Sequence, residues 1–200
     1  METFAKELMR RAVKPTAFSQ VIADGVDDIW AVDLADMVEW AASNDGYKHI
    51  LVIVDAFSRY AWCVPLKTKT AKDVWDAFES VLTVDSLPTK IWVDRGTEFY
   101  NSLWTAKLKA GEITRYSTGS GEYKVSLAER FIRTLKNKIW LHFMTTGGRR
   151  WVDVLPSIVK EYNSTVHSSL GLTPADARQR TATSFTANTG HQAKASRNTN

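Results

Sequence analysis

The hydrophobic and polar positions of the chain follow two periods, one typical of strands and one typical of helices. Apolar runs of strand length predict five β-strands at residues 28–37, 49–55, 60–66, 90–94 and 112–116. Apolar residues at helical spacing predict helices at residues 70–82, 97–110, 124–143 and 151–162, with shorter helical segments at 4–13 and 174–180. Most of the chain is therefore expected to form regular structure.

The order of these elements predicts the fold class. The stretch Ser43-Asn44-Asp45-Gly46 indicates a tight turn, because Asn, Asp and Gly tolerate positive φ angles. The first three strands are therefore expected to form an antiparallel meander. Two further strands alternate with helices. This order predicts an α/β domain that has a mixed five-stranded sheet with helices on both faces.

The composition is that of a globular domain of ordinary size. Hydrophobic residues make up 44% of the 200 residues and aromatic residues 11%, which is enough for a substantial core. The single cysteine, Cys63, excludes an internal disulfide. No run is long and apolar enough to indicate a signal peptide or a transmembrane helix. The four histidines are scattered, and no Cys or His spacing indicates a zinc site.

The net charge of +4 conceals an asymmetry along the chain. Residues 1–129 contain 15 Lys and Arg against 19 Asp and Glu, whereas residues 130–200 contain 11 against 3. A basic half beside an acidic half indicates a polyanion that is bound electrostatically and brought to metal-binding carboxylates. Charge alone leaves open the alternative of a basic surface that only keeps the protein in solution.

Three carboxylates stand where a sheet enzyme could use them. Asp94 ends the apolar run of IWVDRGTEFYN and precedes a turn at Gly96, which places its carboxylate at the rim of the sheet. Asp33 ends the upstream run DDIWAVD, with Asp36 as a nearby competitor. Glu129 lies in a predicted helix, 35 positions after Asp94. Three carboxylates from separate elements suit two Mg²⁺ ions, which prefer oxygen ligands and support in-line phosphoryl transfer.

The same predicted helix places cations beside Glu129. Its apolar stripe leaves Glu129 half-buried at one edge, and Arg133, Lys136 and Trp140 lie close to that edge in angle. A carboxylate in this position could meet both a metal ion and a phosphate backbone. The alternative is an ion pair between Glu129 and Arg133 one turn away, which is the simpler interpretation of Glu129 taken alone.

Several stretches of the sequence resemble one protein family in their order and spacing. These are WAVDLADM, ILVIVDAFSRYAW, VPLKTKT, VDRGTEFYN, AERFIRTLK and YNSTVHSSLGLTPAD. Together they resemble the catalytic core of retroviral-type integrases, most closely the integrases of Polinton/Maverick elements and related viruses. The resemblance implies a ribonuclease H-like fold. It also implies a catalytic trio of Asp33, Asp94 and Glu129 that binds two Mg²⁺ or Mn²⁺ ions.

The resemblance implies a DNA-integrating recombinase that processes 3′ ends and transfers strands into target DNA. The predicted DNA contacts are Lys124, Arg130, Arg133 and Lys136. A homo-oligomer without membrane attachment is expected, in the host nucleus or the virion. Two alternatives stay open. One is a domesticated or truncated core that acts as a non-catalytic DNA-binding or assembly module, and the other is a ribonuclease H-type nuclease.

The expected domains are a basic N-terminal extension at residues 1–27, an integrase catalytic core at residues 28–178 and a disordered polar tail at residues 179–200. The sequence shows neither a His-His-Cys-Cys zinc module before the core nor a recognisable DNA-binding domain after it. These departures put complete integration by this chain alone in question.

Five other polar residues are expected to serve the structure. Asp55 and Glu98 are interpreted as structural or as supports behind the trio, and Asn101 as a cap or a local hydrogen-bonding residue. Asn163 and His167 are expected to stabilise a turn rather than to bind metal.

Overall fold

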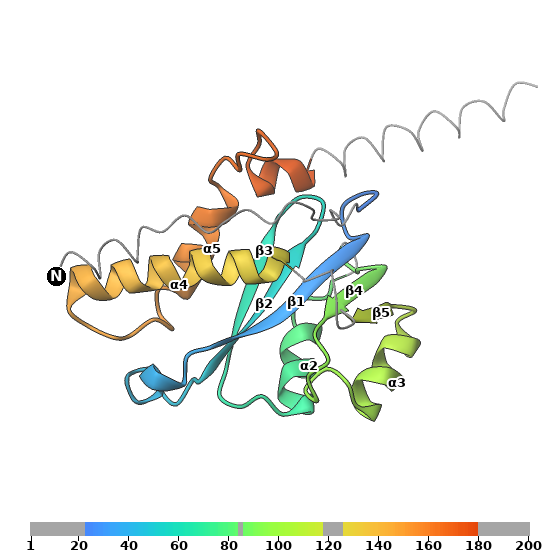
Figure 1. Ribbon diagram of the computed structural model, residues 1–200, viewed down its shortest axis with the longest axis horizontal. Coiled ribbons are helices and arrows are strands. Elements are labelled where there is room, and N and C mark those ends of the chain that lie inside the picture. The colour runs from blue at the N-terminus through green and yellow to red at the C-terminus, as the bar shows by residue number, and fades with distance from the viewer. Residues whose placement is uncertain (1–22, 84–85, 118–125, 180–200) are drawn as a thin grey trace, which may run out of the picture.

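The computed structural model describes residues 23–83, 86–117 and 126–179. Its centre is one sheet in the strand order β3-β2-β1-β4-β5 (Figure 1). The strands are β1 (Ile29–Asp36), β2 (His49–Asp55), β3 (Ala61–Leu66), β4 (Lys90–Val93) and β5 (Thr114–Ser117). The strands match the predicted positions to within one residue at each end, apart from β5, which starts at Thr114 rather than at residue 112.

The sheet is mixed, as predicted. β1, β2 and β3 form the expected antiparallel meander, and β4 and β5 are parallel to β1. The predicted turn between β1 and β2 contains two residues with positive φ, Asp45 and Gly46. Before it lies η1 (Val38–Ser43), a 3-10 helix that the hydrophobic pattern did not predict because the segment is too short to show a period.

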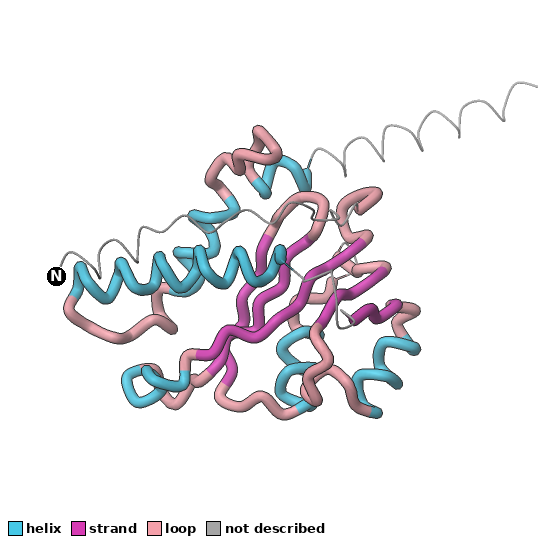
Figure 2. Tube along the Cα trace, viewed as in Figure 1, coloured by secondary structure: helices cyan, strands magenta, loops and turns pink. Residues whose placement is uncertain are grey.

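Helices cover both faces of the sheet, which confirms the predicted layers (Figure 2). One face packs against α2 (Ala71–Glu79) and α3 (Ser102–Ala110), and the other against α4 (Ser126–Thr146) and α5 (Leu155–Asn163). In β1 the alternation of a strand divides the side chains between two cores. Trp30 and Val32 pack towards α2 and α3, whereas Ala31 and Ala35 pack towards α4 and α5.

Two helices begin at side-chain caps. The Thr70 hydroxyl accepts a hydrogen bond from the Asp73 N–H and so caps α2. Asn101 caps α3 by accepting from the Trp104 N–H. The prediction that this helix starts at residue 97 was therefore wrong, because residues 97–100 form turns that precede the cap.

Two other helix ends differ from simple expectation. Gly111 follows α3 directly with a φ of −90°, and the left-handed conformation falls on the next residue, Glu112, with a φ of +55°. The helix predicted from residue 151 begins at Leu155, because Trp151 is buried in a turn that Asn44 holds by accepting from the Trp151 N–H.

Several predictions concern residues outside the described part of the chain. These are the helix at residues 4–13, nearly all of the N-terminal extension and of the polar tail, and the side chain of Lys124. Among the described residues, no helix combines the length and the apolar character needed to cross a membrane.

Candidate active site

The sheet register brings Asp33 and Asp94 to neighbouring positions. β1 and β4 run parallel, and Ala31 is paired with Trp92. The paired positions end there, but the same register continued by two residues would bring Asp33 and Asp94 side by side, and besides burial the negative charge of Asp94 does raise the pKa of Asp33. Asp94 is the first residue after β4 and is exposed, whereas Asp33 lies inside β1 and is partly buried.

Both aspartates belong to the sheet face that α4 covers. Ala31 and Ala35, on either side of Asp33, pack in the core beneath α4, so Asp33 shares their face. Their small side chains leave room for a helix close to the strand. Ala128 is fully buried in the same core, and Glu129 follows it in the first turn of α4. The third predicted carboxylate therefore comes from the helix that packs over β1, the strand that carries Asp33.

The charges of these carboxylates act on one another. The pKa of Asp33 is raised to about 6, first by burial and then by the negative charges of Asp94, Glu129 and Glu98. One hydrogen bond opposes this rise, from the Leu34 N–H to Asp33 Oδ1 at 2.7 Å. The site thus concentrates negative charge that a bound cation would neutralise.

Glu98 is a fourth carboxylate whose charge acts on Asp33, although from the sequence it was expected only to be a structural residue or a support behind the trio. It is partly buried, and its carboxyl carbon lies 2.6 Å from the point where a β-carbon on residue 96 would be. Gly96 therefore allows the Glu98 side chain to fold back over the turn after Asp94. A carboxylate four positions after Asp94, across a turn with a glycine, was the available signal in the sequence.

The three carboxylates are chemically suited to bind a divalent metal ion, although they do not converge on one point in this structure. Carboxylate oxygens are the ligands that Mg²⁺ and Mn²⁺ prefer. Within residues 23–83, 86–117 and 126–179, however, no three His, Cys, Asp or Glu side chains come close enough together to hold one ion. Asp94 is oriented by the Gly96 N–H, which donates to its Oδ1 at 3.0 Å. The negative charges of Asp94 and Glu129 both act on Asp33, so the three carboxylates share one electrostatic environment.

The outer face of α4 carries the predicted DNA contacts. Arg130 and Arg133 are exposed and Lys136 is partly exposed. The expectation that Glu129 is half-buried was wrong, because Glu129 is exposed at the start of the helix. The alternative ion pair between Glu129 and Arg133 is not found among the described residues.

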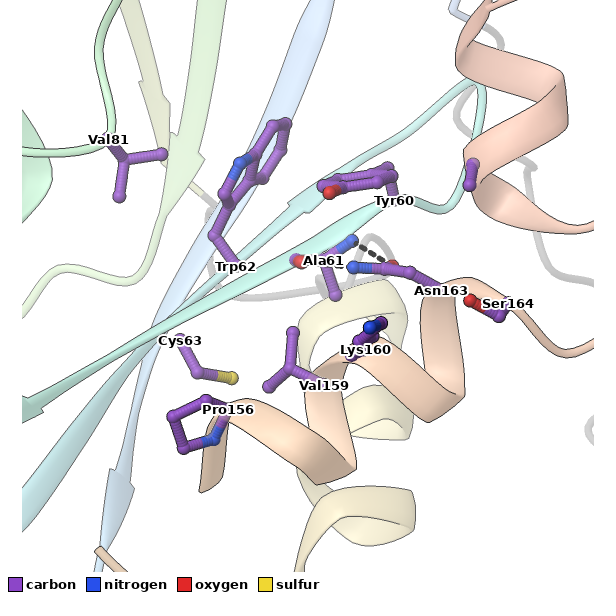
Figure 3. A pocket seen from close by; sticks show the side chains of 11 residues that line it. Tyr60, Ala61, Trp62, Cys63, Val81, Pro156, Val159, Lys160, Asn163 and Ser164 are labelled. Carbon is purple, nitrogen blue, oxygen red and sulfur yellow. Dashed lines mark hydrogen bonds between the residues drawn. The ribbon is translucent and has the colours of Figure 1, made fainter. Parts of the chain in front are cut away.

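Two candidates do serve the structure, as predicted. Asp55 is fully buried, and its carboxylate accepts hydrogen bonds from the N–H groups of Asp27, Phe57 and Ser58. Asn163, at the end of α5, pairs with the edge strand β3: it donates to the Ala61 carbonyl and accepts from the Ala61 N–H, both at 2.9 Å (Figure 3).

Two further candidates are also local in their contacts. His167 forms a turn in which its N–H donates to the Leu172 carbonyl, and its ring Nδ1 lies 3.0 Å from Ser169 Oγ. Asp36, which competed with Asp33, is exposed at the end of β1 and accepts from the Val38 N–H.

Comparison with known families decides what kind of domain this is. A family model described as the integrase core domain matches residues 24–122, which include β1 to β5 and two of the three carboxylates. The chain carries a retroviral-type integrase core. The Polinton/Maverick relationship within this group stays a prediction.

Relatives of this integrase core occur in mobile elements and viruses. A transposon-derived protein of Caenorhabditis elegans is 33% identical over 141 residues, which are 70% of this chain and 49% of that protein. The Gag-Pol polyprotein of avian reticuloendotheliosis virus is 30% identical over 129 residues, which are 64% of this chain and 11% of the polyprotein. The chain thus spans about half of the first relative and a small part of the second.

Solved integrases share the fold. The HTLV-2 integrase catalytic core domain, determined in complex with magnesium, superposes with a TM-score of 0.65 at 18% identity, over 78% of this chain and 99% of that one. A second match is to the simian T-cell lymphotropic virus intasome in complex with the PP2A regulatory subunit B56 gamma. Its TM-score is 0.69 at 14% sequence identity, over 89% of this chain and 66% of that one. The fold of this integrase core is ribonuclease H-like, as the resemblance implied.

Proposed function

We propose that this integrase core, from a mobile element or virus, catalyses metal-dependent phosphoryl transfer on DNA. The observation that supports the proposal best is the raised pKa of Asp33, which reflects burial and the negative charges of Asp94 and Glu129 beside it, together with the parallel pairing of β1 and β4 that leads towards both aspartates. Glu129 in the first turn of α4 completes the carboxylate trio. The trio would hold two divalent ions, which when bound activate the attacking oxygen and stabilise the leaving one.

The chemistry needs no nucleophilic side chain. In 3′-end processing, a water oxygen attacks phosphorus, the bond from phosphorus to the bridging 3′ oxygen breaks, and a 3′-hydroxyl is left. In strand transfer, that 3′-hydroxyl attacks a phosphodiester of target DNA, so one P–O bond forms as another breaks. The number of phosphodiester bonds is conserved in this second step, and no external energy source is required.

The protein contributes orientation and charge. The Leu34 and Gly96 N–H groups each fix one carboxylate oxygen, of Asp33 and Asp94 respectively. The exposed cations on α4, among them Arg133 and Lys136, would bind phosphates beside the reacting end. DNA is the proposed partner, and a homo-oligomer in the host nucleus or the virion is the proposed working form.

An assay on labelled oligonucleotides tests this function. The chain, incubated with Mg²⁺ or Mn²⁺, is expected to cleave or join DNA ends, or to reverse joining on a branched substrate. Asp94→Asn should lower these rates by more than about 100-fold, since it weakens a ligand that positions both reacting oxygens. Asp36→Asn is the matched control, because Asp36 is an exposed aspartate near the end of the same strand as Asp33.

Two outcomes would favour the alternatives. A non-catalytic DNA-binding module draws support from the lack of three converged ligands among the described residues, and it predicts DNA binding with no turnover under either metal. A ribonuclease H-type nuclease predicts cleavage of the RNA strand of a hybrid in preference to DNA. Either result would replace the proposed activity.

A further inference from the structure

Tyr162, near the end of α5, is flanked by basic residues of two other segments. Its ring stacks edge-on against Phe131 of α4, with centroids 4.5 Å apart, which brings the neighbouring Arg130 to this side of the molecule. The His167 ring lies 6.4 Å from the Tyr162 ring, also edge-on. A residue of α4 and a residue of the loop after α5 therefore meet at one aromatic side chain.

A third basic residue joins them from the turn between β2 and β3. Asn163 pairs with Ala61 through two hydrogen bonds, so the end of α5 is tied to the start of β3 (Figure 3). Arg59, two residues before Ala61, is thereby brought next to Tyr162. Arg59 is partly buried, and its Nη1 donates to the Ala56 carbonyl at 2.7 Å. Three chain segments thus supply Arg59, Arg130 and His167 to one place.

The positive charges of the two arginines repel one another. Burial lowers the pKa of Arg59, the positive charge of Arg130 adds to this effect, and the negative charge of Asp55 opposes it. Burial and both arginines lower the pKa of His167, which favours its neutral ring. An anion bound beside the two arginines would relieve their repulsion.

The carboxylates closest to this group are engaged elsewhere. All of the hydrogen bonds to the Asp55 carboxylate come from backbone N–H groups and the Ser58 hydroxyl. On α5, Glu161 forms an ion pair with Lys138 at 2.8 Å. In the described part of the chain, neither Arg59 nor Arg130 forms an ion pair.

Arg178, in the same region, is an arginine with a structural role. Arg178 forms two hydrogen bonds to the Asp27 carboxylate, at 2.9 and 2.8 Å, and its guanidinium lies 4.9 Å from the Trp62 ring centroid. Its charge is fully compensated within the protein. Among the described residues neither Arg59 nor Arg130 forms an ion pair of this kind, and the charge of Asp55 acts on Arg59 only from beyond ion-pair distance.

The backbone of Arg59 is also in an unfavourable conformation. Its φ is +62°, in the left-handed region that glycine adopts freely and that long side chains rarely adopt. Residues in such conformations cluster at functional sites, where the side chain repays the strain through what it binds. Because glycine adopts this conformation freely, replacement of Arg59 by glycine removes the guanidinium without straining the turn.

We propose that Arg59 and Arg130, with His167 beside them, form a binding site for a phosphate of the nucleic-acid backbone. The site is separate from the carboxylate trio and rests on the proposed function, since it assumes a DNA partner. Arginine binds phosphate through two N–H groups at once, and the His167 Nε2, which has no partner among the described residues, can add a third donor. The site would fix the path of DNA over the start of α4.

The test uses Arg59→Gly and Arg130→Gln in the full chain, with fluorescence anisotropy on a labelled duplex over a range of salt. Each variant should weaken binding by about tenfold at low salt and reduce the slope of log K against log salt by about 0.9, the value for one lost phosphate contact. Arg59→Gly should keep or raise the melting temperature because it relieves the positive φ. Lys109→Gln, which removes an exposed cation on α3, should change binding much less.

Each outcome decides the matter. If the parent binds DNA but Arg59→Gly and Arg130→Gln behave like Lys109→Gln, the phosphate site is overturned and the proposed function stands. If the parent binds no DNA, both fail together. Inorganic phosphate is the second arm of the test. Should it stabilise the parent against heat, and not the two variants, while DNA does not compete, the site takes free phosphate and the nucleic-acid assignment is overturned.

Discussion

The carboxylate of Glu98 occupies the space that a side chain on Gly96 would need. A β-carbon at residue 96 would lie 2.6 Å from the Glu98 carboxyl carbon and 2.6 and 2.8 Å from its two oxygens. Atoms cannot approach so closely, but the far end of a glutamate can rotate away. The glycine therefore determines whether a fourth negative charge faces Asp33 or turns to solvent.

This relationship predicts the effect of Gly96→Ala on Asp33. The alanine should displace the Glu98 carboxylate and remove its charge from the surroundings of Asp33, and Glu98→Gln should do the same without a steric change. Both variants should lower the pKa of Asp33 from its value of about 6. The pKa of Asp33 can be measured in each variant by following the chemical shift of its carboxyl carbon by NMR as the pH is changed. An unchanged pKa in both variants would mean that Glu98 does not influence the site.

Asp33 also makes the stability of the metal-free protein depend on pH. Its pKa is about 6 in the folded protein, against the ordinary value of 3.8 expected in the unfolded chain. Between these values the folded state holds more protons than the unfolded state, so the free energy of unfolding should fall as pH rises through this window. Urea unfolding of the parent and of Asp33→Asn should show the fall in the parent and its loss in the variant. Equal pH profiles for the two proteins would contradict the raised pKa.

The cations on α4 predict the salt dependence of DNA binding. If Arg133 and Lys136 each contact a phosphate, the double variant to Ala should bind DNA more weakly at every sequence tested. The slope of log K against log salt should fall by about 1.8, which is 0.9 for each contact. Lys109→Ala, on the helix α3 across the sheet, serves as the control. A double variant with the parent's slope would place the DNA path elsewhere.

Replacement of Asn163 alone is expected to lower the free energy of unfolding substantially. Asn163→Ala would leave the Ala61 N–H and carbonyl without their partners at the edge of the sheet, where Asn163 is only 6% exposed. Unsatisfied buried groups of this kind cost about 1–3 kcal/mol each, so a loss of about 2 kcal/mol or more is expected in chemical denaturation. Ser164→Ala, next in sequence and exposed, should cost much less. Similar losses in the two variants would show that the pairing with Ala61 contributes little.

Local patterns in the sequence determined most of the fold. The apolar run of β2 is buried at every position, and a strand covered on both faces has such a run because neither face meets water. The alternation in β1 and the turn chemistry at Asp45 and Gly46 likewise depend on neighbouring residues alone. The resemblance to integrases, which rested on short stretches of sequence in a fixed order, was confirmed by the integrase core family model and by the fold of solved integrases.

The site depended on relationships that no local pattern contains. That the charge of Asp94 acts on Asp33 depends on the pairing of β1 with β4, strands separated by more than 50 residues. The fold-back of Glu98 depends on a turn geometry, and the exposure of Glu129 depends on how α4 lies on the sheet. Hydrophobic periodicity reports burial averaged over a helix and cannot give the position of one residue at its end.

The same reason explains why Arg59 was overlooked. In the sequence it is one polar residue in a short turn, and only its φ angle and its proximity to Arg130 and His167 distinguish it. Backbone strain and the electrostatic field of distant residues arise when separate segments pack together. The sequence by itself therefore determined the elements, their order and the chemistry available, whereas the tertiary structure alone decided which charges meet.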